Sequence, residues 1–76
     1  MLDLAKTKLE KHSVTIAGHR TSISLEVGFW HHFRRFAERD NLSINELIRR
    51  LDEARTGSLS GAMRVYVLEQ LEKEHS

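Results

Sequence analysis

Three side chains that can form hydrogen bonds alternate along residues 20–25, Arg-Thr-Ser-Ile-Ser-Leu. In a β-strand successive side chains point to opposite faces, so Arg20, Ser22 and Ser24 share one face. An arginine can donate two hydrogen bonds to guanine, and a serine hydroxyl can donate to or accept from either purine. The pattern predicts a strand whose polar face contacts the edges of DNA bases, while its apolar face packs on helices. A solvated strand of no special function would show the same alternation.

A single strand leaves its backbone N–H and C=O groups unpaired, which costs free energy. In a chain of 76 residues, the expected partner is the same strand of a second copy. The two strands would form an antiparallel ribbon of the size that enters a major groove. Residues 13–19 also alternate, with Gly18 as a bend or bulge. Two interpretations stay open there: one long bent strand over residues 13–25, or a small separate strand near residues 14–16.

Helices are predicted to follow the strand. The first begins at Glu26 or Val27 and ends at Asp40-Asn41, because asparagine tolerates the left-handed cap conformation. The second opens with Ser43 as N-cap, and Glu46 is expected to bond back to it in a capping box. The third begins near Leu59. The apolar positions at helical spacing are Phe29, Trp30, Phe33, Phe36 and Ala37 in the first helix, Ile44, Leu47, Ile48, Leu51 and Ala54 in the second, and Ala62, Met63, Tyr66, Val67 and Leu71 in the third. The aromatic residues of the first helix are therefore interpreted as core, and not as a surface on which bases stack.

Composition narrows the classes of function. The net charge of +1 is the sum of two unequal parts: residues 1–39 have a net charge of +3, and residues 40–76 have a net charge of −2. There is no cysteine, which excludes disulfides and thiolate metal sites. No apolar run approaches the ~18 residues that span a membrane, and no signal peptide is visible, so a cytoplasmic location is expected. A chain this small builds no roomy cleft, so no enzymatic activity and no cofactor are expected.

Five histidines raise the question of a metal site: His12, His19, His31, His32 and His75. Adjacent His31 and His32 would point about 100° apart on a helix, so they cannot both bind one ion from that segment. The expectation is that no metal is bound. A metal-responsive variant that uses histidines from two chains stays open.

The order of strand, helix, asparagine turn and capped helix resembles the ribbon-helix-helix DNA-binding fold of the Arc/MetJ type. The similarity is greatest to a small bacterial family of uncharacterised ribbon-helix-helix proteins. It rests on the run of residues 11–26, the pair Phe29-Trp30 and a closing helix over residues 59–71. The sequence departs from the superfamily in having Asn41 where glycine is usual. The third helix and residues 13–19 are additions to the minimal fold.

The resemblance implies a mainly α fold with a short β ribbon, in an intertwined homodimer. The expected divisions are an N-terminal arm over residues 1–11, the ribbon-helix-helix domain over 12–57 and an additional helix over 58–76. Arg20, Ser22 and Ser24 would face the bases. The phosphate contacts are predicted at Lys11, His19, Ser43, Ile44 and Asn45, the last three because a helix N-terminus presents free N–H groups.

The predicted function is therefore a homodimeric or tetrameric protein that binds double-stranded DNA, with no membrane contact. It would repress transcription by blocking its operator. The alternative is a protein-interaction module, similar to an antitoxin or adaptor, that works through the third helix and the N-terminal arm. A protein partner at the third helix is compatible with both.

Overall fold

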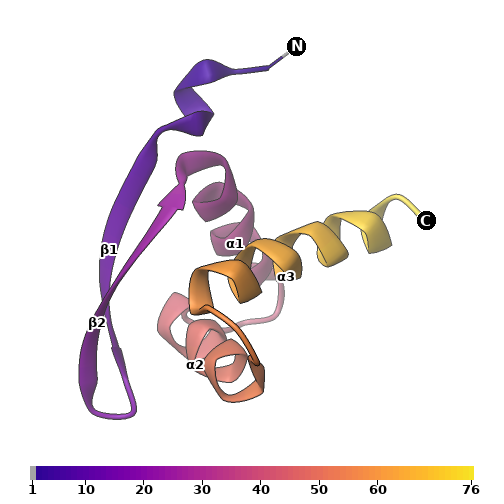
Figure 1. Ribbon diagram of the computed structural model, residues 1–76. Helices are drawn as coiled ribbons and strands as arrows, with labels where there is room; N and C mark the ends of the chain where they lie inside the picture. Colours follow the sequence, from indigo (N-terminus) through magenta and orange to yellow (C-terminus); the bar gives the residue numbers. More distant parts are fainter. Residues whose placement is uncertain (1) are drawn as a thin grey trace.

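The computed structural model describes residues 2–76, which form a β hairpin packed on three helices (Figure 1). A short 3₁₀ helix, η1 (Leu4–Thr7), precedes the hairpin strands β1 (Leu9–Ile16) and β2 (His19–Glu26). The helices α1 (Val27–Arg39), α2 (Ile44–Ala54) and α3 (Leu59–Glu74) follow. None of the described helices is long and apolar enough to cross a membrane.

The two strands are joined by a turn of two residues, Ala17 and Gly18. Both have positive φ, 51° and 81°, as a type I′ turn requires. This turn suits the right-handed twist of the strands, and it sets the antiparallel register from Leu9 opposite Glu26 to Ile16 opposite His19. Of the two interpretations left open by the sequence, the separate strand is the correct one. It begins at Leu9, within the segment predicted to be an arm.

Within the chain, β2 pairs along one edge with β1. The physical reason is the short connection: a two-residue turn closes with little loss of chain entropy. A strand has two edges, and the closing pair of a two-residue turn exchanges hydrogen bonds, so the backbone groups of Arg20, Ser22 and Ser24 point to the other edge of β2. The predicted pairing of this strand with a second copy stays a prediction for that edge.

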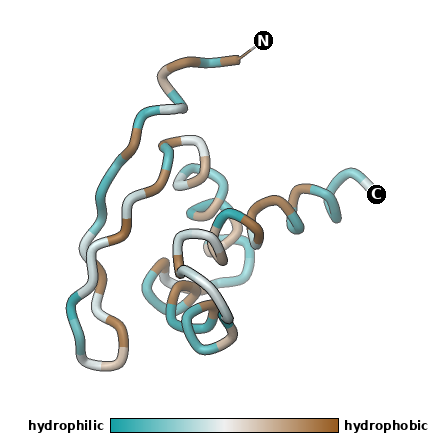
Figure 2. The backbone as a smooth tube through the Cα atoms, in the orientation of Figure 1, coloured by the Kyte–Doolittle hydropathy of each residue, from teal (hydrophilic) through white to brown (hydrophobic). Residues whose placement is uncertain are grey.

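One face of the hairpin lies on the helices and supplies part of the core. Its buried side chains are Val14, Ile16, Ile23 and Leu25. Figure 2 shows the corresponding alternation of apolar and polar residues along the strands. Trp30 of α1 attaches β1 to the helices, because its indole N–H donates a hydrogen bond to the backbone carbonyl of Glu10 at 2.8 Å.

The aromatic residues of α1 form the centre of the core, as predicted. Trp30, Phe33 and Phe36 are almost completely buried, and Phe29 packs at the edge of the cluster. The helix ends where the sequence predicted, since Asn41 has a φ of 56°. These aromatic rings are shared contacts, since both the hairpin and α3 pack their buried side chains against α1.

Only one of the two hydrogen bonds of the predicted capping box forms at the start of α2. The Ser43 hydroxyl accepts from the backbone N–H of Glu46 at 3.0 Å. The Glu46 carboxylate does not reach back to Ser43: it accepts from Arg49 at 2.7 and 3.0 Å and from Arg50 at 3.3 Å. The two-point, charge-assisted contact with Arg49 is stronger than one bond to a backbone amide. It holds the pKa of Glu46 at about 2.

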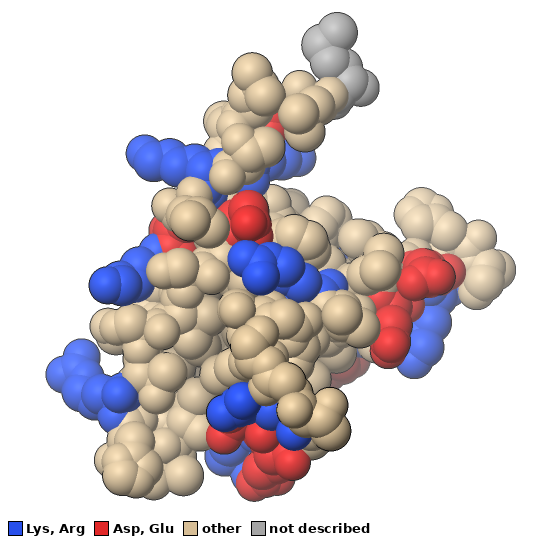
Figure 3. All heavy atoms as spheres, in the orientation of Figure 1, with Lys and Arg blue, Asp and Glu red and all other residues tan. Residues whose placement is uncertain are grey.

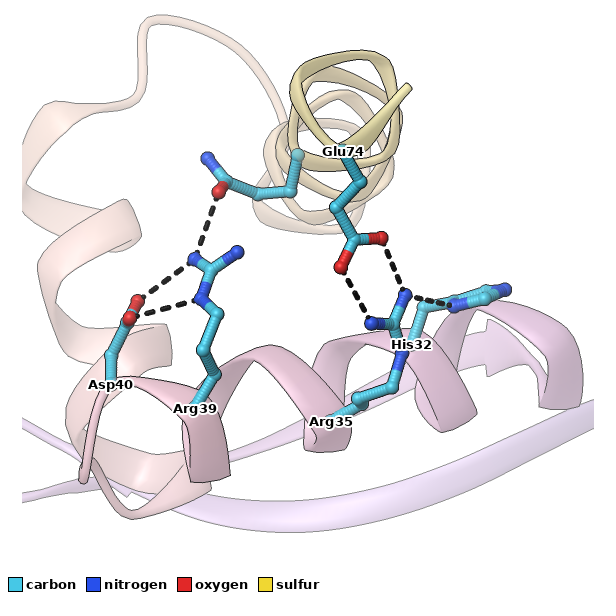
Figure 4. Close-up of polar contacts among 6 residues, drawn as sticks. His32, Arg35, Arg39, Asp40 and Glu74 are labelled. Carbon is cyan, nitrogen blue, oxygen red and sulfur yellow. Dashed lines mark hydrogen bonds and ion pairs between the residues drawn. The ribbon is translucent and has the colours of Figure 1, made fainter. Parts of the chain in front are cut away.

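α3 is attached to α1 by polar contacts as well as by the core (Figure 4). Arg35 of α1 donates two hydrogen bonds, of 2.7 and 2.9 Å, to the carboxylate of Glu74. Arg39 donates to Asp40 at the end of its own helix and to Gln70 of α3, the latter at 2.8 Å. These contacts join residues 31 and 39 positions apart and align the C-terminal half of α3 along α1.

Candidate nucleic-acid interface

The hairpin turns its second face away from the helices. We call this surface the outward face, and its members are six exposed residues that lie opposite one another in pairs: Lys11 and Ser24, Ser13 and Ser22, and Thr15 and Arg20. Their neighbours along each strand are the residues that enter the core. The structure thus brings the three predicted base-facing residues to one exposed surface, and β1 adds three more.

The outward face carries two cations, four hydroxyl groups and no acid. Glu26 is one pair beyond Ser24 in the register, and its carboxylate accepts from Arg64 of α3 at 3.0 and 3.3 Å. The hydrogen bond from Arg64 lowers the pKa of Glu26, and the positive charge of the arginine compensates that of the carboxylate. In the view of Figure 3, acidic side chains gather over α2 and the end of α3, while the part of the hairpin nearest the turn shows basic and uncharged residues. Such a surface attracts a polyanion and offers groups that can hydrogen-bond with it.

The dimensions of the outward face follow from strand geometry. Lys11 and Thr15 are separated by four residues, or about 13 Å at ~3.3 Å per residue. Because Arg20 lies opposite Thr15, the two cations stand at opposite ends of the face. A length of about 13 Å corresponds to about four base pairs at ~3.4 Å each.

The N-terminus of α2 lies beside one end of the outward face. The Asn45 side-chain amide donates to the backbone carbonyl of Thr15 at 3.1 Å, which ties this helix end to the outer edge of β1. The Ser43 hydroxyl is already occupied as the N-cap. The backbone N–H groups of Ile44 and Asn45 have no partner within residues 2–76. Ser43, Ile44 and Asn45, predicted to contact phosphate, are therefore next to the ribbon, with two free donors among them.

The other two predicted phosphate contacts occupy different faces. Lys11 is on the outward face, directly across from Ser24. His19 pairs with the buried Ile16 next to the turn, so it projects from the opposite side of the ribbon and remains exposed there. The predicted roles of Lys11 and His19 stay predictions.

Ser13 and Thr15 are outward-facing residues that the sequence argument did not assign to the site. The sequence pattern could have identified them, because polar residues alternate with Val14 and Ile16, which face the core. A two-residue connection between two alternating runs is typical of a hairpin. The turn is Ala-Gly and lacks the asparagine or aspartate that usually marks such turns.

A second surface feature is apolar and lies on the side of α3. Val65 and Leu68 are 53% and 55% exposed. They line a groove of about 320 Å³ together with Phe29, Arg64 and Leu71. Within residues 2–76, no group of three or more histidine, aspartate or glutamate side chains is placed to hold a metal ion.

A two-stranded ribbon followed by two helices defines the ribbon-helix-helix class, and the comparisons with known proteins agree. The sequence matches the family model described as "Ribbon-helix-helix domain" over residues 9–71. The chain therefore belongs to the ribbon-helix-helix domain family, with α3 inside the matched region. Domains of this class are typically DNA-binding regulators of transcription, generally dimerise and are not typically enzymes.

Among solved structures, the fold is similar to that of an uncharacterized protein from Bordetella pertussis Tohama I, with a TM-score of 0.79 at 23% sequence identity. The similarity covers 97% of this chain and 66% of that chain, so this chain spans about two thirds of the length of its structural neighbour. The search of curated proteins gave no match.

Proposed function

We propose that this protein binds double-stranded DNA by inserting the outward face of its ribbon into the major groove, where Arg20, Ser22 and Ser24 contact base edges. The observation that carries the proposal is the two-sided character of the hairpin. One face is buried on the helices, and the other holds two cations and four hydroxyls without an acid. A surface needed only for solubility would have no reason to exclude acidic residues.

The size of the ribbon supports the same function. Two strands lie about 5 Å apart. With side chains on the exposed face, they match a major groove about 12 Å wide, which admits a two-stranded ribbon. In this arrangement the free N–H groups of Ile44 and Asn45 stand beside the groove, where a helix N-terminus favours a phosphate. Lys11 and His19 are the further candidates for phosphate contact.

Repression and a homodimer are the finer parts of the proposal. A protein seated in the groove at an operator would block the polymerase sterically. The class generally dimerises, and two copies would double the number of phosphate contacts. A second copy would pair at the outer edge of β2, to which the backbone groups of Arg20, Ser22 and Ser24 point.

The test is a titration of a labelled duplex, selected from random sequence, at several salt concentrations. We expect log affinity to fall steeply with log salt, as several phosphate contacts require. The Arg20→Ala variant should lose about 1–3 kcal/mol on the selected site. Arg34→Ala is the matched control, because Arg34 is an exposed arginine on α1, outside the ribbon. An affinity independent of salt, or equal for wild type and Arg20→Ala, would refute the proposal.

The second candidate function is the protein-interaction module predicted from the sequence. The observation that favours it is the apolar groove beside α3, with Val65 and Leu68 exposed. The same titration separates the two candidates. If no duplex can be selected from random sequence by a chain that remains folded, the second candidate is supported.

A further inference from the structure

We infer that the outer side of α3 is a contact between two copies of this chain, in which two α3 helices pack antiparallel across a two-fold axis. This side consists of Val65, Leu68 and Glu72, with Arg64 at its edge, and we call it the α3 face. The inference goes beyond the proposed function and does not depend on it, because no nucleic acid takes part in the contact.

The first observation is that α3 is apolar on two opposite sides (Figure 2). Met63 and Val67 are buried in the core. Val65 follows Met63 by two residues, about 200° around the helix, so it projects away from the core. Val65 and Leu68 are each more than half exposed, and among the large hydrophobic side chains exposed within residues 2–76 they are the ones that belong to an α helix. A surface helix usually has charged and polar residues on its outer side, so the α3 face is typical of a helix that packs against a partner.

The α3 face borders the groove of about 320 Å³ that Phe29, Arg64 and Leu71 line together with Val65 and Leu68. Phe29 and Leu71 are partly buried and pack against the core. An apolar side chain of a second copy that entered the groove would therefore touch the edge of the core. Its removal from water would favour association.

The charges at the two ends of the α3 face favour a second copy in antiparallel orientation. Arg64 directly precedes Val65, and Glu72 lies four residues after Leu68. A two-fold axis uses the same surface of both copies. In an antiparallel pair each Val65 lies opposite the partner's Leu68. Each Arg64 then lies toward the partner's Glu72, whereas a parallel pair would bring the two Glu72 carboxylates together, which is unfavourable.

Arg64 can take part in such a contact although it is already paired within the chain. Its Nε and Nη2 groups donate to the carboxylate of Glu26 at 3.0 and 3.3 Å. Its Nη1 group donates to no acceptor within residues 2–76. An arginine has five N–H donors in a planar arrangement, so a second carboxylate can bind at the remaining side.

The α3 face is small. Residues 64–72 span about 12 Å at ~1.5 Å per residue, on a helix about 10 Å across. A stable interface buries roughly 800 Å² on each partner, which is several times this footprint. The α3 contact therefore adds to a larger one, in agreement with a class that generally dimerises. We expect an assembly whose stability depends on protein concentration and on the α3 face.

The first experiment measures the dissociation constant of the assembly by analytical ultracentrifugation, in the absence of DNA. Leu68→Ser should weaken association about 10- to 100-fold, because two leucines in each contact lose their burial. Leu4→Ser is the matched control: it makes the same change at a leucine that is 73% exposed and lies in η1, outside the α3 face. Both leucines are exposed, so circular dichroism should show the wild-type helix content in both variants.

Glu72→Lys tests the orientation of the two helices. In the antiparallel pair it places a lysine toward the partner's Arg64, so it should weaken association, and added salt should reduce this effect. In a parallel pair the same change would replace one like-charge pair by another, and association would stay the same.

The second experiment uses the absence of cysteine from the sequence, because introduced thiols are then the only ones. Val65→Cys and Leu68→Cys are mixed in equal amounts under reduction and then oxidised, and mass spectrometry separates the three possible disulfide-linked dimers. The antiparallel pair should give the mixed dimer in excess of the half that random pairing produces. His31→Cys with Arg34→Cys is the control, since these exposed positions of α1 have the same spacing of three residues.

The inference is supported if Leu68→Ser and Glu72→Lys weaken association and the mixed dimer is in excess. It is overturned if Leu68→Ser associates as the wild type does, or if the mixed dimer is no more abundant than in the α1 control. An excess of dimers linked between identical positions would also overturn it, because the helices would then be parallel. A wild-type α3 face that binds a different protein but not a second copy would overturn it in favour of the second candidate function. The proposed DNA binding is tested separately, since no DNA enters these measurements.

Discussion

The turn between β1 and β2 offers a direct test of the hairpin on which the proposals depend. Ala17 occupies the first central position of the type I′ turn with a φ of 51°. For L-residues other than asparagine, aspartate and glycine, this left-handed conformation costs roughly 1–2 kcal/mol. Asparagine is the preferred residue at this position. Ala17 is exposed, so a replacement changes no packing.

From these facts, Ala17→Asn should raise the free energy of unfolding by about 0.5–1 kcal/mol. For a domain of this size, 1 kcal/mol moves the melting temperature by about 4–8 °C, so the expected rise is about 2–8 °C. Ala17→Val should lower stability by about 1–2 kcal/mol, because a β-branched residue with positive φ is strained. The signs of the two effects are opposite, which makes the pair more informative than either variant alone.

The assay is thermal and urea unfolding by circular dichroism, with fluorescence of the single tryptophan, Trp30, as a second probe. All variants are compared at one protein concentration, since association would make the midpoint depend on it. If residues 17 and 18 were part of one extended strand paired with a second copy, valine would stabilise and asparagine would destabilise. That result would refute the hairpin.

Two further predictions concern the contacts that position the ribbon and α2. Trp30→Phe should destabilise the fold by about 2–4 kcal/mol, because it removes a buried indole and leaves the carbonyl of Glu10 without that donor; a loss below about 0.5 kcal/mol in urea unfolding would show that β1 is not anchored there. The second concerns Glu46, whose pKa falls from 4.5 to about 2 because Arg49 donates to its carboxylate. A depressed folded-state pKa contributes stability above the unfolded pKa and loses it as pH falls toward the folded one. The wild type should therefore be more stable than Glu46→Gln at pH 6, and this difference should shrink between about pH 5 and pH 2; a difference that stays constant over this range would contradict the assignment.

The sequence predicted the helices well because their signals are local. The spacing of Trp30, Phe33 and Phe36 predicts α1 and its buried face, and these residues are the core. Ser43 predicts the start of α2, and its hydroxyl makes the expected cap. The predicted return contact of Glu46 failed, since a neighbouring arginine one turn ahead competes for the same carboxylate.

Residues 20–25 show what the sequence alone leaves undetermined. The alternation alone determined which of its side chains share a face, because the period of a strand is fixed at two. It did not determine the neighbour of that strand. Pairing depends on backbone groups that are the same in every residue, so β1 and a second copy of β2 were both chemically possible partners.

The tertiary structure decided the pairing through contacts between residues distant in the sequence. Trp30 donates to Glu10, and Asn45 donates to Thr15, over separations of 20 and 30 residues. These contacts hold β1 against the helices and bring Lys11, Ser13 and Thr15 onto the surface that carries Arg20. The sequence by itself thus determined the chemistry of the polar face of β2, and the packing of β1 on the helices decided that β1 adds its own side chains to that face.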